Sequence, residues 1–263
     1  MRHFPLVLAL TLVACAALAG CGRVGGRGRP EPADAQAAAR ARMVETQIRS
    51  RGIEDGRVLR AMGEVPRHLF VPDDLAGSAY SDQPLSIGHG QTISQPYVVA
   101  LMSELADLTP GERALEVGTG SGYAAAVLSA LADSVYTIEI VAPLAASAAE
   151  RLSRLGYSNV RVRCGDGYRG WPDRAPFDAI VVTAAPDRVP QPLLDQLAVG
   201  GKLVIPVGGV SQDLLEITRT ADGLVERSVI PVRFVPMTGE AQERGGEGPH
   251  PDSGDREPVG GGP

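Results

Sequence analysis

Aromatic residues are scarce in this chain of 263 residues. They make up 4% of it, and Trp171 is the one tryptophan. Because so few aromatic rings are available, we expect a hydrophobic core built mainly from Ala, Val, Leu and Ile. The hydrophobic content of 44% and the charged content of 21% are ordinary for a soluble globular protein. The length allows one α/β domain with additional segments.

Cysteine and net positive charge are also in short supply. The three cysteines, Cys15, Cys21 and Cys164, show no paired spacing of the kind that binds zinc, so we predict no metal site. Lys and Arg number 25 against 31 Asp and Glu, which gives a net charge of −6. A nucleic acid held mainly through its phosphates requires an excess of basic residues, so the composition argues against such a partner.

One apolar run stands near the N-terminus. Residues 4–19 are almost entirely apolar and follow Arg2 and His3, and the run is short for a membrane-spanning helix. A charged start, a short apolar stretch and small residues at its end are typical of a secretory signal. Leu18-Ala19-Gly20-Cys21 resembles the lipobox of bacterial lipoproteins. That resemblance implies cleavage before Cys21 and attachment of lipid to its thiol.

The composition divides the chain into four segments. We predict a lipoprotein signal peptide at residues 1–20, a flexible tether rich in Gly and Arg at 21–39, a folded domain at 40–238 and a disordered tail at 239–263. The signal predicts a membrane-anchored lipoprotein on the periplasmic side. Translation from Met43 stays open as an alternative that would give a cytoplasmic protein.

Helical patterns come first in the folded domain. Apolar residues recur at helical spacing over residues 40–51, Gly52 can end that helix, and Asp55 can cap a second short one. Prolines and glycines mark residues 72–96 as a looped region. A further helix is expected at 98–108.

Strands and helices then alternate. We predict strands at residues 114–117, 135–140, 159–163, 177–183 and 202–207, helices at 123–132, 143–155 and 192–197, the last ended by Gly200-Gly201, and a closing antiparallel pair at 214–219 and 225–234. This alternation indicates an α/β fold with a doubly wound, mostly parallel sheet.

Three features at the ends of successive predicted strands can carry chemistry. A loop with Gly118, Gly120 and Gly122 lets the backbone approach a ligand closely at the start of a helix. Glu139 follows 21 residues after the first glycine and can accept hydrogen bonds from ribose hydroxyls. Asp166 ends the third strand, where its carboxylate could meet an adenine amino group.

The glycine spacing narrows the class of ligand. A dinucleotide fingerprint places a glycine at the sixth position of the loop, where this chain has Tyr123. The spacing therefore disfavours a pyrophosphate and suits a nucleoside cofactor without phosphate. Each feature alone has an ordinary structural explanation, such as a tight turn or an Asp-Gly turn, but their joint placement favours a shared ligand.

Several segments share a pattern with one enzyme family. They are Val65-Pro66-Arg67-His68-Leu69-Phe70-Val71-Pro72, Gln91-Thr92-Ile93-Ser94-Gln95-Pro96, Glu116-Val117-Gly118-Thr119-Gly120-Ser121-Gly122-Tyr123, Gly165-Asp166-Gly167, residues 177–185, residues 200–208 and residues 232–239. Together they resemble the protein-L-isoaspartate O-methyltransferases over residues 40–242. The glycine motif is shared by many methyltransferases, whereas the segment around Ser94 is far more specific to this family.

The resemblance implies a Rossmann-like S-adenosylmethionine-dependent methyltransferase fold and a set of site residues. Ser94 would be the catalytic residue. Contacts with the cofactor S-adenosylmethionine are implied for Gln91, Thr92, Ile93, Gly118, Thr119, Gly120, Glu139, Asp166 and Gly167. Some members have a histidine where this chain has Val99, so no role is carried over to that position.

The implied reaction moves the sulfonium methyl group of the cofactor to the free α-carboxylate of L-isoaspartyl residues in damaged proteins and peptides. A carboxylate is ionised near neutral pH and needs no general base, so catalysis can rest on orientation. Ser94 would orient the acceptor, and the ester would close to a succinimide without further help. We expect a monomer.

Other functions stay open at this point. The same fold could methylate a different acceptor, or the chain could be a lipoprotein that keeps the fold as a binding module without catalysis. A nicotinamide dehydrogenase is disfavoured by Tyr123 at the sixth loop position.

Overall fold

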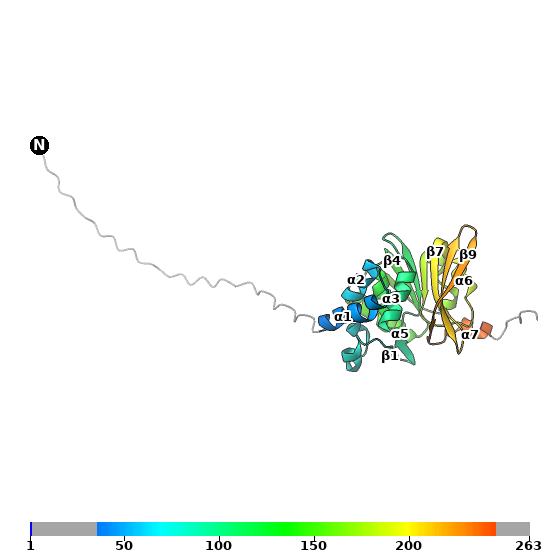
Figure 1. The fold of residues 1–263 in the computed structure, drawn as a ribbon, viewed down its shortest axis with the longest axis horizontal. Coiled ribbons are helices and arrows are strands. Elements are labelled where there is room, and N and C mark those ends of the chain that lie inside the picture. Colours follow the sequence, from blue (N-terminus) through cyan, green and yellow to red (C-terminus); the bar gives the residue numbers. More distant parts are fainter. Residues whose placement is uncertain (2–35, 246–263) are drawn as a thin grey trace, which may run out of the picture. The chain divides into compact units, whose positions relative to one another are not determined.

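The computed structural model describes residue 1 and residues 36–245. Residues 36–245 belong to one compact unit, in which helices lie on both faces of a large sheet (Figure 1). The predicted signal peptide and Cys21 lie outside the described residues. Among the residues that are described, no helix is long and apolar enough to cross a membrane.

The helices and strands are short. The α-helices are α1 (Ala37–Met43), α2 (Gly56–Glu64), α3 (Pro96–Leu105), α4 (Tyr123–Ser129), α5 (Ala142–Arg154), α6 (Gln191–Asp195) and α7 (Glu240–Gly245). The strands are β1 (Leu85–Gly88), β2 (Gln91–Ile93), β3 (Arg113–Val117), β4 (Ser134–Glu139), β5 (Val160–Cys164), β6 (Phe177–Val182), β7 (Leu197–Val207), β8 (Gln212–Thr220) and β9 (Gly223–Val232). A π-helical segment (Val44–Ile48) continues α1, and 3-10 turns occupy Arg49–Arg51, Arg67–Phe70, Asp73–Ser78, Gly167–Arg169 and Pro172–Arg174.

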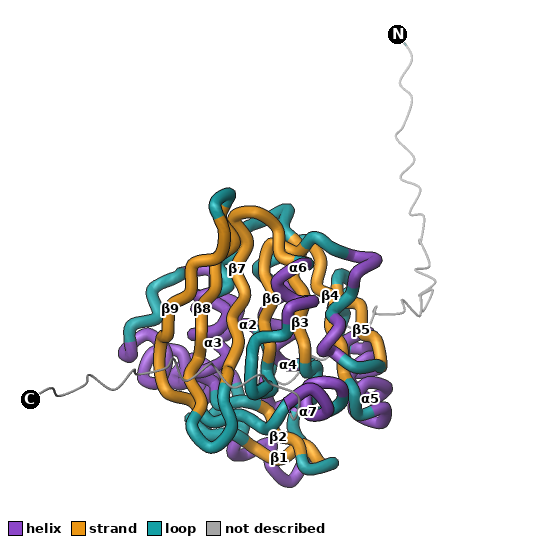
Figure 2. The backbone as a smooth tube through the Cα atoms, turned by 90° about the vertical axis from the view of Figure 1, so that its right-hand side faces the viewer, coloured by secondary structure: helices purple, strands orange, loops and turns teal. Residues whose placement is uncertain are grey.

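The main sheet confirms the predicted fold class. Its seven strands follow the order β5-β4-β3-β6-β7-β8-β9, which can be followed across Figure 2. The five neighbouring strands β5, β4, β3, β6 and β7 are parallel to one another. β8 pairs antiparallel with β7 on one side and with β9 on the other. The chain runs outward from β3 through β4 to β5 and returns to the other side of β3 as β6. A ligand crevice is expected at such a switch point, beyond the carboxyl ends of the strands.

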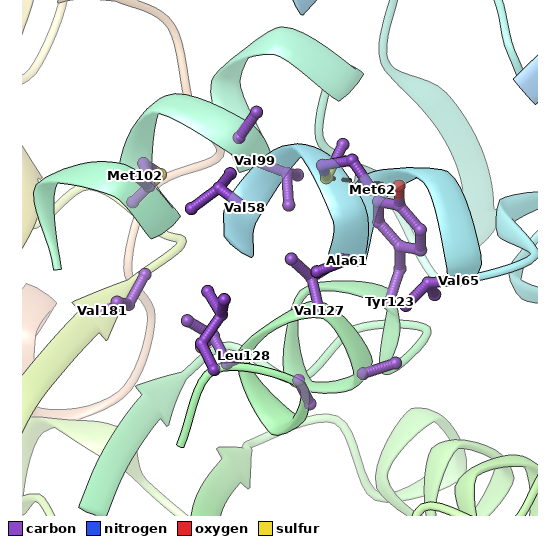
Figure 3. Close-up of a cluster of buried hydrophobic side chains, with 14 of the residues drawn as sticks. Val58, Ala61, Met62, Val65, Val99, Met102, Tyr123, Val127, Leu128 and Val181 are labelled. Carbon is purple, nitrogen blue, oxygen red and sulfur yellow. Dashed lines mark hydrogen bonds between the residues drawn. The ribbon is translucent and has the colours of Figure 1, made fainter. Parts of the chain in front are cut away.

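Alternate residues of the central strands feed two cores. On β6, Ala179 and Val181 face a core that includes α1 to α4, whereas Ile180 and Val182 face the core that includes α6 and α7. Figure 3 shows the first core, where side chains of α2, α3 and α4 converge near Val181 of β6. The members are mostly aliphatic, as the low aromatic content predicts. Both faces of the sheet are therefore covered by helices. A ligand site is expected at the edge where the parallel strands end.

The structure confirms the early helices and revises some boundaries. Residues 37–51 are continuously helical, Gly52 ends them in the left-handed region, and the Asp55 carboxylate caps α2 by accepting from the Arg57 N–H. α1 begins inside the predicted tether, and α7 lies inside the predicted tail. Both helices are anchored by tertiary contacts, since Met43 and Ala241 are buried. The predicted tether and tail each contain too few apolar residues for a helical spacing to be recognised in the sequence.

Two further expectations were wrong. The predicted loop at 72–96 contains the β1–β2 hairpin, which turns at His89 and Gly90, both with positive φ. Gly200-Gly201 do not end a helix but lie within β7. A Cβ on Gly201 would lie 2.9 Å from the Asp178 carbonyl oxygen, so this glycine allows close backbone approach at the irregular pairing of β6 and β7.

Candidate active site

A pocket lies at the switch point, beyond the carboxyl ends of β3, β4 and β6. It encloses about 590 Å³ of free space, part of it open to solvent. The β1–β2 hairpin and the segment before α7 lie at the same end of the sheet (Figure 2), and both contribute lining residues to the pocket. Its lining residues are Gln91, Thr92, Val117, Gly118, Gly120, Ile138, Glu139, Ile140, Val141, Gly167, Thr183, Ala184, Val235, Pro236, Met237 and Thr238. None of these described residues is a Lys, Arg or His, which fits a ligand without phosphate.

The glycine loop connects β3 to α4. The N–H groups of Gly118 and Thr119 donate to the Ile138 carbonyl at 2.8 and 3.2 Å, which holds the loop against β4. Gly118 has a φ of +100°, and a Cβ there would collide with the Thr183 hydroxyl. That hydroxyl donates to the Gly118 carbonyl at 2.7 Å. Only glycine suits this position, because both its backbone conformation and its close neighbour exclude a side chain.

Glu139 is the carboxylate in the wall of this pocket. It ends β4 and is 5% exposed. Its Oε2 accepts from the Gly120 N–H at 2.7 Å and its Oε1 from the Val141 N–H at 2.9 Å. These two bonds fix the carboxylate, and each oxygen keeps a lone pair for another donor. The arrangement can receive two neighbouring hydroxyl groups.

Asp166 and Gly167 lie at the same end of the sheet, but they differ in their relation to the pocket. Gly167 lines the pocket, whereas Asp166 is not among its lining residues. The Asp166 oxygens accept from the Tyr168 N–H at 2.9 Å and from the Glu240 N–H at 2.8 Å. Glu240 also pairs with Arg169 at 2.6 Å. The first residue of α7 therefore holds the Asp166 carboxylate at the rim of the site.

Ser94 lies next to the pocket, between two adjoining cavities. The smaller one, of about 330 Å³, includes Ile93, Ser94, Val99 and Thr119 among its walls. The larger one is a groove of about 1180 Å³, called here the Ser94 groove. Its lining residues are Arg51, Pro84, Thr92, Ser94, Gln95, Tyr97, Val98, Thr183, Ile230, Pro231, Val232, Arg233, Phe234 and Val235.

Thr92 and Thr183 connect these three cavities. Both residues line the pocket at the switch point, called here the Glu139 pocket, as well as the smaller cavity and the Ser94 groove. A ligand in the Glu139 pocket and a second ligand in the Ser94 groove would therefore meet beside these two threonines. The arrangement can bring a donor and an acceptor together.

One buried acid lies beneath the glycine loop. Glu116 of β3 is fully buried, and its Oε2 accepts from the Thr137 hydroxyl at 2.5 Å. Burial raises the pKa of Glu116 to about 8, while the hydrogen bond from Thr137 opposes the rise. The Thr137 oxygen also bonds the Thr119 hydroxyl at 2.6 Å. The carboxyl group of Glu116 is therefore largely protonated at neutral pH. Through Thr137 it is linked by hydrogen bonds to Thr119 of the glycine loop.

Two groups of lining residues were not expected from the sequence. Thr183 was seen as the end of a strand, and its place beside Gly118 follows from the pairing of β3 with β6. Residues 235–238 reach the pocket because Ala185 holds them, its N–H donating to the Val235 carbonyl and its carbonyl accepting from the Met237 N–H, both at 2.8 Å. The strand order could have placed Thr183, whereas residues 235–238 have no strand end or glycine turn that marks a site, and only the family resemblance of residues 232–239 singles them out.

Comparison with known proteins identifies the family. The family described as protein-L-isoaspartate(D-aspartate) O-methyltransferase matches residues 38–242. A Gloeobacter violaceus protein named protein-L-isoaspartate O-methyltransferase is 60% identical over 200 residues, which cover 75% of this chain and 98% of that protein. An Anaeromyxobacter protein named protein-L-isoaspartate O-methyltransferase 2 is 52% identical over 242 residues, 90% of this chain and 97% of that protein.

Solved structures agree with the sequence comparison. A Plasmodium falciparum protein described as a protein-L-isoaspartate O-methyltransferase, in complex with S-adenosyl-L-homocysteine, has a TM-score of 0.67 and 30% identity, over 76% of this chain and 98% of that one. Another protein-L-isoaspartate O-methyltransferase has a TM-score of 0.69 and 31% identity, over 76% of this chain and 66% of that one. The chain belongs to the protein-L-isoaspartate(D-aspartate) O-methyltransferase family.

Proposed function

We propose that this chain transfers a methyl group from S-adenosylmethionine to the free α-carboxylate of L-isoaspartyl residues in damaged proteins and peptides, which starts their repair through a succinimide. The observation that carries the proposal is the meeting of the Glu139 pocket and the Ser94 groove at Thr92 and Thr183. Family membership supplies the acceptor class.

The pocket residues fit the nucleoside part of S-adenosylmethionine. The fixed Glu139 carboxylate can accept from both ribose hydroxyls, and Gly118 and Gly120 leave room for close approach. Gln91, Thr92 and Gly167 form further walls. The cofactor supplies an electrophilic methyl group on a sulfonium. The related Plasmodium falciparum protein was solved with the corresponding demethylated product.

The acceptor side needs orientation rather than a base. An α-carboxylate is already ionised near neutral pH. The Ser94 hydroxyl makes no hydrogen bond with another described residue and lines the groove, so it can donate to one carboxylate oxygen and turn the other toward the Glu139 pocket. Ordered placement of two reactants can lower a barrier by up to ~7–11 kcal/mol in favourable cases.

Anchoring outside the cytoplasm is a second, separate part of the proposal. The lipobox-like Leu18-Ala19-Gly20-Cys21 supports lipid attachment at Cys21 on the periplasmic side of a membrane. A start at Met43 would omit Arg40, whose Nε donates to the Gly63 carbonyl at 2.7 Å and ties α1 to α2. We also propose that the enzyme is a monomer and that its substrates are isoaspartyl proteins and peptides.

Methyl-labelled S-adenosylmethionine tests the activity. With an isoaspartyl peptide, we expect label in a base-labile ester on the peptide. Calorimetry with the same cofactor is the companion measurement. Cofactor binding without transfer to the peptide would favour a different acceptor, and no cofactor binding would favour a binding module.

Ser94→Ala tests the acceptor site. We expect the affinity for S-adenosylmethionine to stay within about twofold, because Ser94 does not line the Glu139 pocket. We expect kcat for the isoaspartyl peptide to fall by roughly tenfold or more, as for the loss of one orienting hydrogen bond to a charged group. Steady-state kinetics measure this, and unchanged turnover would remove Ser94 from the mechanism.

A further inference from the structure

Arg67 is a fully buried arginine behind the Ser94 segment. Its Nε donates to the Ala79 carbonyl at 2.7 Å, and its Nη2 donates to the Ser94 carbonyl at 2.7 Å. Its guanidinium carbon lies 4.7 Å from the ring centre of Tyr123. Tyr123 is the first residue of α4, directly after the glycine loop, and Figure 3 shows its ring among the side chains between α2 and α4. Arg67 therefore lies between the Ser94 segment and the first residue of α4.

The placement of this cation is unfavourable for stability alone. Within residues 36–245, no carboxylate forms an ion pair with Arg67, and its Nη1 has no hydrogen-bond partner. Burial lowers the pKa of the Arg67 guanidinium, although Tyr123 and Asp82 oppose that effect. An unpaired charge in the interior costs free energy that an apolar side chain would not. The arrangement calls for a role other than packing.

The residues that follow Ser94 have an anchor of opposite charge, Asp82. The Asp82 carboxylate accepts from the Gln95 side-chain amide at 2.6 Å and from the Tyr97 N–H at 3.3 Å. It also pairs with Arg51 at 2.6 Å, and Arg51 stacks over the Tyr97 ring. The residues after Ser94 are therefore held by Asp82, while the Ser94 carbonyl is held by the buried Arg67.

We infer that Arg67 is a positioning residue, which fixes the peptide unit of Ser94 so that its hydroxyl stays aimed at the acceptor carboxylate. The inference rests on the proposed function. An arginine suits this task because its planar group donates in two directions at once. A lysine has one nitrogen at the end of a flexible stem and cannot span the Ala79 and Ser94 carbonyls in the same way. The backbone of residue 94 would then gain freedom to turn.

A double-mutant cycle with Ser94→Ala tests this role. Ser94→Ala keeps the backbone carbonyl that Arg67 binds and removes only the hydroxyl. With the full-length chain and an isoaspartyl peptide, we expect Arg67→Lys to lower kcat at least tenfold while the affinity for S-adenosylmethionine changes less than twofold. In the Ser94→Ala background, we expect Arg67→Lys to lower kcat less than twofold, because the group it positions is gone.

Arg219→Lys is the matched control. Arg219 also donates to backbone carbonyls, those of Leu194, Asp195 and Leu197, but it lines none of the three cavities of the site. We expect its substitution to leave kcat within twofold. Hydrogen exchange over residues 91–95 is the second readout, and Arg67→Lys should speed it where Arg219→Lys does not.

The outcomes separate the positioning role from the activity. An equal loss of kcat from Arg67→Lys in both backgrounds, or unchanged hydrogen exchange at residues 91–95, would overturn the role of Arg67. Absence of methyl transfer by the wild type would overturn the proposed function instead, and hydrogen exchange would then decide on Arg67 alone.

Discussion

Glu116 shows how a single buried group can make the fold depend on pH. It lies under the glycine loop, and its pKa of about 8 stands well above the ordinary value of 4.5 that it regains on unfolding. Between these two values the folded chain binds more protons than the unfolded chain. Stability therefore falls as the pH rises through this window and levels off above it.

Glu116→Gln should remove this dependence. We expect the free energy of unfolding of the wild type to fall by up to roughly 3–5 kcal/mol between about pH 4.5 and about pH 8, and the variant to lack this part of the slope. Urea unfolding at a series of pH values measures both curves. Parallel curves for the two proteins would show that Glu116 does not carry the effect.

At the same scale, the sequence predicts some site residues better than others. Glu139 and Gly118 could be placed because a strand end and a tight turn are local features. The contact of Asp166 with the cofactor stays a prediction, and the structure adds that its carboxylate accepts from the Glu240 N–H at 2.8 Å. That contact joins residues 74 positions apart, so no local sequence pattern predicts it. The same limit applies to Arg67, whose bond to the Ser94 carbonyl spans 27 positions.

Among the elements, the Ser94 groove carries charge of one sign. Its charged lining residues are Arg51 and Arg233. Arg51 is already paired with Asp82, whereas Arg233 is exposed and forms no ion pair with another described residue. An acidic residue next to the isoaspartyl residue of a peptide would therefore find a favourable potential there.

Arg233→Glu should change the preference among peptides. We expect KM for an isoaspartyl peptide with acidic neighbours to rise severalfold, and KM for its counterpart with basic neighbours to fall, with little change in kcat. Both effects should shrink at high salt, since exposed charges are screened. Equal changes for the two peptides would contradict an electrostatic role of the groove.

The elements also show where periodic patterns fail. The parallel strands β3, β4 and β6 were predictable because apolar β-branched runs mark buried strands. The β1–β2 hairpin was missed because its strands have four and three residues and its turn uses His89-Gly90 rather than Asn-Gly. The predicted strand at 202–207 is shorter than β7, because a glycine pair usually marks a turn. Here Gly201 instead permits a close approach between β6 and β7.

For the whole molecule, the site is assembled from distant parts of the chain at one end of one sheet. The hairpin supplies Gln91 and Thr92, the strand ends supply Gly118 and Glu139, and residues 235–238 come from beyond the last strand. Fold class was accessible from alternation of strands and helices. Which segments meet at this end of the sheet depends on the strand order, and the sequence pattern does not determine that order.

The proposed membrane anchor makes a prediction at the scale of the whole chain. We expect the wild type to incorporate labelled palmitate in a bacterial host that processes lipoproteins and to sediment with membranes. Cys21→Ala should lose the label and move to the soluble fraction, because the acylated thiol is the anchor. Cys164→Ala serves as the control, and equal labelling of all three proteins would contradict attachment at Cys21.

Methyl transfer to isoaspartyl carboxylates can be measured directly in a competition between two peptides. The chain is mixed with S-adenosylmethionine and two peptides of the same sequence, one with an isoaspartyl and one with a normal aspartyl linkage, each distinguished by an isotope label. Mass spectrometry then follows methyl ester formation on both. We expect ester on the isoaspartyl peptide alone, and equal methylation of both peptides, or of neither, would contradict the proposed activity.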